Sequence, residues 1–578
     1  MTASAKIALI LVTALLAAAG CRSRGSADDV LLRGGDLKNL TVERFPESPL
    51  AAIAHFNTDV PSQVTVTILG QDGEDLSKTV EDFRTDHDIP LLGLYPDFRN
   101  TVILRLTTRD GRSTVDSLRI TTRPLPRQYR HLSLQADRIG SKPLAPGMYL
   151  LLLNREYGGS TEKGMFLVAD HFGKIRWVYM GDHWFLGKIL PNGNLVVQRS
   201  SPLERLQEAY NQCIVYAYAK TGWQFLYRDL YWEMPNTYIP SVMNEQRKNP
   251  VRSLPARMAE WLPRTMVNHN ALAEIDLFGR EVTSWRAAGY SIHHDFIFLP
   301  NGNLLALAST LDSDEDLIIE MGKKSHAIER EIRFKEILDA NRPMMPRHIH
   351  EPDWLHANAL YFDGRDSTIV VSARNQSAVV KLTLDSLHIR WILGNHEHWK
   401  EPFRRLLLRP VGEPFQWQWG QHAPMHSPKD PRRILVYDNG NMRSYERPLP
   451  ADSSYSRAVE YEIDDRGMTV RQTWEYGKKF GSQRFTPIVG SARYLSNGNR
   501  LICFGALARD LQGRVVRWIE QGPQLGQYRN RSVKSSAVID ETTSDLPAER
   551  LLEIRISDRD PDTYAGYLVY RAYHVSFD

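Results

Sequence analysis

A short hairpin signature recurs along this chain and limits the folds that it can adopt. Leu-Pro-Asn-Gly-Asn stands at 190–194 and again at 299–303, and Leu-Ser-Asn-Gly-Asn stands at 495–499. Asn-Gly between apolar residues is the strongest short signal for a β-hairpin. A second pattern, in which an acidic residue and a turn precede a strand that ends in Trp, recurs at 170–177, 276–285, 385–391 and 465–474. Repeated hairpins of this kind predict a β-propeller.

The length of the chain sets the expected number of blades. The chain has 578 residues, too many for one ordinary core. With four strands per repeat, the roughly 450 residues that contain the pattern correspond to about six blades. We therefore predict an all-β fold with a six-bladed β-propeller at 126–578. The pattern is interrupted at 201–265 and 313–347, and we expect these two stretches to be insertions on one face of the propeller.

Residues 36–125 are expected to form a smaller domain of their own. Short runs with alternating apolar residues, such as 63–69 and 101–106, are separated by turn signals such as Arg109-Asp110-Gly111-Arg112. Regular short strands of this kind predict a small N-terminal β-sandwich. Pro124-Leu125-Pro126 is typical of a linker.

The first residues are predicted to be a targeting segment. Lys6 is followed by the apolar run 7–19, which is too short to span a bilayer as a mature helix. Ala18-Ala19-Gly20 before Cys21 resembles a bacterial lipobox. We therefore expect 1–21 to be a lipoprotein signal peptide that ends at a lipidated Cys21, and 22–35 to be a tether. The protein would face the periplasm in a bacterial cell envelope. An ordinary secretory peptide with an incidental cysteine is the alternative.

The composition excludes some classes of function. The net charge of +4 is small for this length and gives no argument for nucleic acid as a partner. Cys213 and Cys503 are the only cysteines after Cys21. They exclude a disulfide framework and a Cys-rich metal cluster, and their spacing leaves open whether they pair.

Histidines occupy equivalent places in three successive repeats. The openings of three hairpins contain Ile292-His293-His294-Asp295-Phe296, Leu355-His356-Ala357-Asn358 and Gly420-Gln421-His422-Ala423-Pro424. Equivalent positions in neighbouring blades meet at one mouth of the central channel. The sequence therefore predicts a histidine cluster built from residues that are far apart along the chain.

The hairpin around the turn 363–367 adds two more polar side chains. Strand residues alternate between faces, so His356 and Asn358 are expected to share one face. A symmetric turn would place Arg374 across from His356. An imidazole, an amide and a guanidinium in one place form an anion-binding arrangement, because Arg offers a planar fork of donors.

Two kinds of chemistry fit such a cluster. A metal site is the first, since imidazole is a common metal ligand, but the chain has no His-Glu-x-x-His motif and a guanidinium would repel a cation. The second is attack of a neutral imidazole on sulfur or phosphorus, with Arg and His holding the oxygens. The chain has neither a Gly-x-x-x-x-Gly-Lys-[Ser/Thr] loop nor a Gly-x-Ser-x-Gly motif, which argues against a nucleotide donor and against a serine hydrolase.

At these residues the sequence resembles the bacterial aryl-sulfate sulfotransferase family. In the small domain the resemblance depends on 87–97, and in the repeats it depends on 292–305, 354–374 and 420–424. It implies an exported six-bladed propeller behind a small β-sandwich. It also implies transfer of a sulfuryl group from an aryl sulfate to a phenol, with no nucleotide donor and no cofactor.

The resemblance also implies roles for individual residues. His422 matches the nucleophile that becomes a transient sulfohistidine in ping-pong catalysis, and His426 is a weaker candidate. The residues that hold the sulfate match His356, Asn358, Arg374 and one of His293 or His294, of which His294 is favoured. A membrane anchor at Cys21 is expected, and a homodimer is left open. A propeller that binds sulfated or anionic ligands without turnover, or a metal-dependent hydrolase, are the alternative functions.

Overall fold

The computed structural model describes most of the chain. The described residues are 30–33, 37–71, 74–157, 160–161, 164–181, 183, 186–199, 271–287, 289–310, 313–344, 354–510, 512–516, 533–560 and 566–577. Cys21, the lipobox, Cys213 and 201–265 lie outside them. The lipid anchor, the homodimer and the role of 201–265 therefore stay predictions. No helix in the described ranges is long and apolar enough to cross a membrane.

The chain divides into two compact units. The first comprises Met1–Pro124 with Phe577–Asp578, and the second comprises Leu125–Ser576. The first unit contains β1 (Val30–Arg33), β2 (Lys38–Arg44), β3 (Ala51–Ile68), β4 (Leu76–Leu92), β5 (Arg99–Thr108) and β6 (Ser113–Thr121).

Strand β3 connects two groups of strands in the first unit. Its first part pairs with β2 and its last part pairs with β5, while β4 runs along both parts. The register with β4 breaks between Asn57 and Ser62. Val64, Val66 and Ile68 are buried and alternate with less buried residues, as expected of a strand with one face on a core. The predicted small β-sandwich is confirmed.

The second unit consists of six sheets in the part of the chain that the structure describes. The first three sheets contain, in order, β8 (Met148–Tyr157), β9 (Ser160–Thr161), β10 (Met165–Ala169), β11 (Ile175–Tyr179) and β33 (Gly566–Val575); then β12 (Gly187–Ile189), β13 (Leu195–Arg199), β14 (Ala271–Ile275) and β15 (Glu281–Arg286); then β16 (Ser291–Phe298), β17 (Leu304–Thr310), β18 (Ser313–Met321) and β19 (Ile328–Arg333).

The other three sheets follow the same plan. They contain β20 (Ala357–Asp363), β21 (Thr368–Ala373), β22 (Ala378–Thr383) and β23 (Ile389–Gly394); then β24 (Arg409–Pro410), β25 (His422–His426), β26 (Arg433–Asp438), β27 (Arg457–Asp464) and β28 (Thr469–Tyr476); then β29 (Ser491–Tyr494), β30 (Arg500–Asp510), β31 (Val533–Thr542), β32 (Arg550–Asp558) and β7 (Leu132–Arg138). Short 3-10 turns lie at η2 (Arg127–Tyr129), η4 (Phe334–Glu336), η5 (Phe403–Leu406), η6 (Ala451–Ser453) and η7 (Lys478–Arg484).

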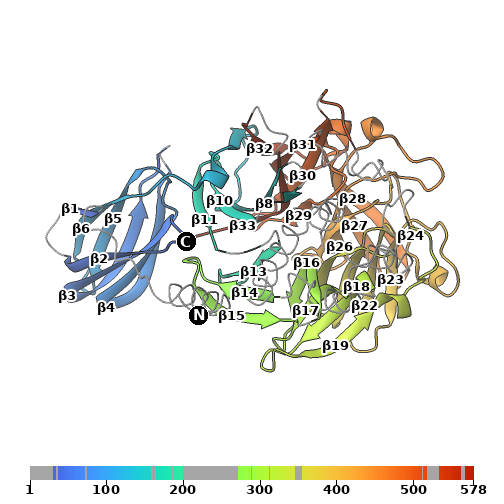
Figure 1. The fold of residues 1–578 in the computed structure, drawn as a ribbon, viewed down its shortest axis with the longest axis horizontal. Helices are drawn as coiled ribbons and strands as arrows, with labels where there is room; N and C mark the ends of the chain where they lie inside the picture. Colours follow the sequence, from blue (N-terminus) through green and yellow to red (C-terminus); the bar gives the residue numbers. More distant parts are fainter. Residues whose placement is uncertain are drawn as a thin grey trace, which may run out of the picture. The chain divides into compact units, whose positions relative to one another are not determined.

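The two ends of the second unit close the ring of sheets. β7, the first strand of the unit, pairs with β32 in the last sheet, and β33, its last strand, pairs with β8 in the first sheet. Figure 1 shows β8, coloured teal, and β33, coloured red, side by side. The predicted all-β propeller is confirmed, and its sheets are closed by strands from both ends of the unit.

The sequence repeats explain how each sheet forms. The Asn-Gly turns connect the first and second strands of three sheets, and in each turn the Asn side chain accepts a hydrogen bond from the backbone N–H two residues on, at 2.9–3.0 Å. The glycines adopt positive φ, with values of 85° at Gly193 and 86° at Gly302, which favours Gly there. The recurring Trp residues lie on β11, β15 and β23, each an end strand of its sheet, and on β28, which is followed only by the two-residue β24.

One sequence expectation about the propeller was wrong. Within the stretch 313–347, which was expected to be an insertion, residues 313–333 form β18 and β19, the last two strands of the third sheet. Because this stretch contains many charged residues, its two strands were not recognised in the sequence. Leu317, Ile318 and Ile319 are buried in the sheet, and the buried Asp316 is paired with Lys335 at 3.0 Å.

Candidate functional site

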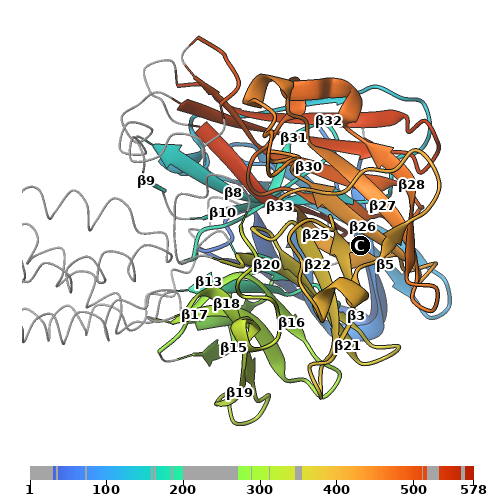
Figure 2. The ribbon, with the colours of Figure 1, turned by 90° about the vertical axis from the view of Figure 1, so that its right-hand side faces the viewer.

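End strands of neighbouring sheets contact one another in the second unit. β16 contacts β20, β20 contacts β25, β25 contacts β29, and β29 contacts β33. Each of these strands lies at one end of its sheet. Figure 2 shows β16, β20, β25 and β33 near one another. The predicted histidines all lie on or directly beside these strands.

Irregular backbone marks the histidine positions. The register of β16 shifts between Ile292 and Phe296, and β20, β25 and β33 have similar shifts. Three non-glycine residues at these places adopt positive φ, namely His294 at 52°, His356 at 50° and Ala423 at 50°. Positive φ is rare for residues with a side chain, and β-bulges often lie beside functional sites, where they redirect side chains. The bulge at Asn358 also interrupts the strict alternation from which a shared face with His356 was predicted.

His294 and His356 come together from different sheets. Their ring centroids lie 4.8 Å apart in an edge-to-face arrangement. His293 lies next to His294, with 2.9 Å between the two Nδ1 atoms. The ring of His294 also lies 6.3 Å from that of Tyr570 on β33. The contact with His356 supports the choice of His294 over His293 as the member of the cluster.

His422 is buried and its ring has a fixed orientation. Its Nδ1 lies 2.6 Å from Oδ1 of Asn439. The Nδ2 of Asn439 donates to the carbonyls of Thr486, at 2.8 Å, and Val489, at 2.9 Å. The amide oxygen must therefore face His422, so Nδ1 of His422 carries the proton and Nε2 keeps its lone pair.

Burial and nearby positive charge lower the pKa of two histidines of the cluster. The pKa of His422 lies well below its ordinary value, first because of burial and then because of the charge of Arg374. The pKa of His294 is also well below its ordinary value, because of burial and then because of His356. A neutral imidazole is the form that can act as a nucleophile.

Arg374 and Asn358 lie beside the histidines. The predicted hairpin is confirmed, since the Arg374 N–H donates to the carbonyl of His356 at 3.1 Å. The buried guanidinium donates from Nη1 to Asn375 Oδ1 at 3.0 Å and from Nη2 to the carbonyl of Pro487 at 3.2 Å. Asn358 is fully buried, and its Nδ2 donates to the carbonyl of Gln421, the residue before His422, at 2.9 Å.

His426 is placed apart from this cluster. It lies at the other end of β25, where its ring is 5.5 Å from that of Tyr361 and its Nε2 is 3.8 Å from Asp363 in the hairpin turn. The structure thus separates His426 from His422. Within the described ranges, no group of three or more His, Cys, Asp or Glu side chains is placed to hold a metal ion. Cys503 is a buried free thiol.

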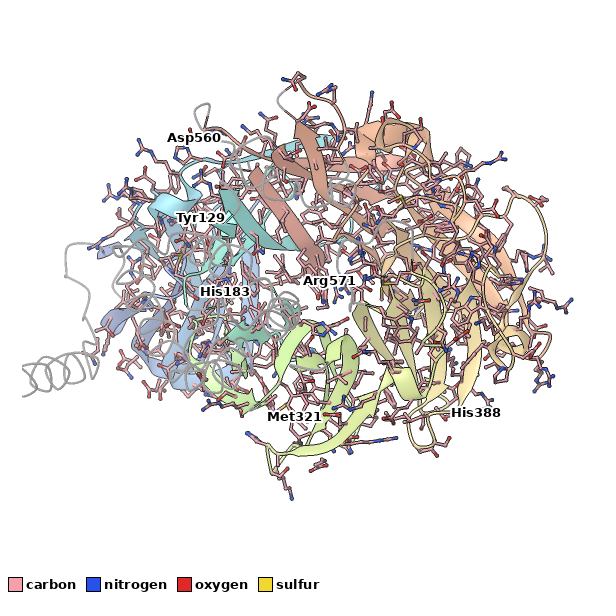
Figure 3. All side chains as sticks on the ribbon, turned by 45° about the vertical axis from the view of Figure 1, so that its right-hand side comes forward. Tyr129, His183, Met321, His388, Asp560 and Arg571 are labelled. Carbon is pink, nitrogen blue, oxygen red and sulfur yellow. The ribbon has the colours of Figure 1, made fainter. Side chains whose placement is uncertain are left out.

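Sequence reasoning missed three residues that belong to this site. Asn439 orients His422, as described above. Asp295 and Arg571 form a buried ion pair at 3.0 Å, and Arg571 lies on β33, far along the chain from the histidines. Figure 3 shows Arg571 toward the centre of the unit, where several sheets meet. The sequence signal that could have revealed Arg571 is that it is the single charged residue in the run 567–573, whose other residues are apolar or aromatic.

The geometry specifies what the site can do. His422 presents an unprotonated nitrogen from a buried position, Arg374 supplies a fixed cation, and His356 lies in a half-buried position beside His294. Together they can hold an anionic group, attack its central atom and stabilise the charge that develops.

Comparison with known proteins agrees with this site. The arylsulfotransferase (ASST) family model matches residues 238–554, and the arylsulfotransferase Ig-like domain model matches 40–123. Arylsulfate sulfotransferase AssT of Escherichia coli O6:H1 is 25% identical over 538 residues, which cover 82% of this chain and 85% of that protein. AssT of Lelliottia amnigena is 24% identical over 537 residues, covering 81% and 85%. Because the first match spans more than half of the chain, this protein belongs to the arylsulfotransferase family.

Proposed function

We propose that the protein transfers a sulfuryl group from an aryl sulfate to a phenol through a sulfohistidine at His422. One observation carries this proposal: the contact between His422 Nδ1 and Asn439 leaves Nε2 as the only ring nitrogen with a free lone pair, inside a buried site beside Arg374. An imidazole that merely bound an anion would donate an N–H, and a nucleophile needs the opposite arrangement.

The first half-reaction forms a covalent intermediate. Nε2 of His422 forms a bond with the sulfur, and the bond between sulfur and the aryl oxygen breaks. The phenolate leaves with that electron pair and takes a proton from the imidazolium form of His356, which becomes neutral. Arg374 donates hydrogen bonds to the sulfuryl oxygens and holds the group in place as the bond to the aryl oxygen breaks.

The second half-reaction reverses these steps with another phenol. The acceptor gives its proton to His356, and its oxygen attacks the sulfur. The bond from Nε2 to sulfur breaks, and His422 returns to its neutral form with its Nδ1 proton still directed at Asn439. The two half-reactions together require neither a metal nor a nucleotide. The phenol released in the first half-reaction leaves before the acceptor enters.

The proposal predicts nucleotide-independent transfer. Purified protein given 4-nitrophenyl sulfate and a phenol, with no nucleotide, is expected to release 4-nitrophenolate at a rate that depends on the phenol. Double-reciprocal plots at several acceptor concentrations should be parallel, because the two substrates never share the site. An absence of transfer across a broad panel of aryl sulfates and phenols would contradict the proposed function.

A second prediction concerns the orientation of His422. Asn439→Ala should lower the turnover number by about two powers of ten, because the ring loses the acceptor that selects its productive tautomer. The KM for the donor should change much less, since Arg374 is untouched. Steady-state kinetics combined with a melting curve test this. The matched control is Asn100→Ala, which removes a buried, hydrogen-bonded asparagine from the first unit. Equal turnover in Asn439→Ala and wild type would rule out the orienting role.

A further inference from the structure

We propose that Asp295 and Arg571 are positioning residues that together hold the bulge of β20, and so place Asn358 and His356 for the reaction. This inference rests on the proposed function. It assigns the last strand of the second unit, β33, to the active site, although none of the residues expected from the sequence lies on that strand.

The ion pair contacts the backbone on both sides of the bulge. Nη1 of Arg571 lies 3.0 Å from Oδ2 of Asp295, and Nη2 of Arg571 donates to the carbonyl of Asn358 at 3.0 Å. The same Oδ2 of Asp295 accepts the N–H of Leu360 at 3.0 Å. A carbonyl and an N–H two residues apart are thus bound by the two members of one ion pair.

The bulge needs these partners. Asn358 is fully buried and has no partner residue in β21, because the register shifts between Ala357 and Ala359. β20 is also the end strand of its sheet, so its outer edge has no further strand of that sheet to bond. Buried backbone groups are costly without hydrogen bonds. Asp295 from the third sheet and Arg571 from the first sheet supply them, which fixes three sheets relative to one another at the site.

Tyr570, the residue before Arg571, binds the backbone of the neighbouring bulge in β16. The hydroxyl of Tyr570 donates to the carbonyl of His294 at 2.6 Å, where the backbone has positive φ. Tyr570 is itself the extra residue in β33, whose register shifts between Val569 and Arg571. Two consecutive side chains of β33 therefore hold the strands that carry His294 and Asn358.

Together with Lys188, the ion pair forms a positively charged group beside the histidines. Lys188 lies 2.9 Å from the second oxygen of Asp295, so the three ionised groups have a net charge of about +1. Arg571 lowers the pKa of His422, after burial, Arg374 and His356. It also lowers the pKa of His294, after burial, His356, His293 and His422.

Two substitutions at Arg571 distinguish its effect on the geometry of the bulge from the effect of its charge on the histidines. Arg571→Gln removes the cation and leaves the Asp295 carboxylate near the histidines, so the acid limb of the pH profile for donor cleavage should move to higher pH. The turnover number should fall by about tenfold to a hundredfold. Arg571→Lys keeps the charge and should keep the acid limb, but it should still lower turnover, because one ammonium cannot reproduce the two-sided fork.

The matched control is another buried Arg–Asp pair. The Nε of Arg155 on β8 lies 3.0 Å from Asp558 on β32. Arg155→Gln should lower the melting temperature and leave the pH profile unchanged. If Arg571→Gln does not fold, the double variant Asp295→Asn/Arg571→Gln removes both charges and keeps hydrogen-bonding groups. That variant should also show reduced turnover.

One further readout does not depend on catalysis. NMR titration of the His294 and His422 rings should show higher pKa values in Arg571→Gln than in wild type or in Arg155→Gln. Folded Arg571 variants with wild-type turnover, pH profile and ring titration would overturn the positioning role. If wild-type protein transfers no sulfuryl group but the ring titrations shift as expected, the proposed function fails and the placement of the pair stands.

Discussion

Replacing His422 by alanine is expected to abolish sulfuryl transfer and the covalent adduct with it. The rate should fall by about four powers of ten or more, because the substitution removes the nitrogen that forms the bond to sulfur. Intact-mass measurement after a short incubation with donor alone should show one added sulfuryl group on the wild type and none on His422→Ala.

The same strand offers a matched control for this experiment. His426 lies at the far end of β25, beside Tyr361 and Asp363. His426→Ala should therefore still form the adduct. An adduct that persists in His422→Ala would show that another residue is the nucleophile. Tight donor binding by the wild type with no adduct would favour a binding module over an enzyme.

Replacing Arg374 by lysine should slow transfer by two to three powers of ten while the protein melts close to wild type. Contacts with Asn375 and Pro487 hold the guanidinium of Arg374 in place, so its orientation is fixed before the donor binds. Lysine keeps the charge but supplies a flexible point donor. The loss of one charge-assisted hydrogen bond to the transition state amounts to roughly 2–4 kcal/mol. Donor cleavage measured under single-turnover conditions reports this step directly.

An arginine in the same hairpin serves as the control. Arg365 lies in the turn of this hairpin, where its Nε is 2.7 Å from Asp363 and its side chain is 45% exposed. Arg365→Lys should therefore act like wild type. Near-normal turnover in Arg374→Lys would make Arg374 a structural residue of the hairpin and would remove it from the site.

Local signals were enough to predict the repeated hairpins. An Asn-Gly turn is specified by a few adjacent residues, so each copy predicts its own hairpin wherever it occurs. The same repetition predicted that His294, His356 and His422 meet, because equivalent places in neighbouring sheets converge. The strands at 313–333 were missed because charges that are paired in the folded protein look like a solvated surface in the sequence.

Other features of the site have no local signature. His294, His356 and Ala423 adopt backbone conformations that usually favour glycine, and nothing in their sequence neighbourhood indicates this. Such conformations persist because contacts from other sheets maintain them. Arg571 escaped prediction for a related reason, since its partners, Asp295 and the Asn358 carbonyl, become neighbours only when the ring of sheets closes.

The closure of the ring by β33 has a consequence for the order in which the protein is made. A ribosome completes His294, His356, Arg374 and His422 long before it reaches Tyr570 and Arg571. A nascent chain can thus contain all four residues while it still lacks the strand whose Tyr570 and Arg571 bind the carbonyls of His294 and Asn358. We therefore expect a chain that ends before β33 to be inactive even though it contains these residues, because the pairing of β33 with β8 closes the ring.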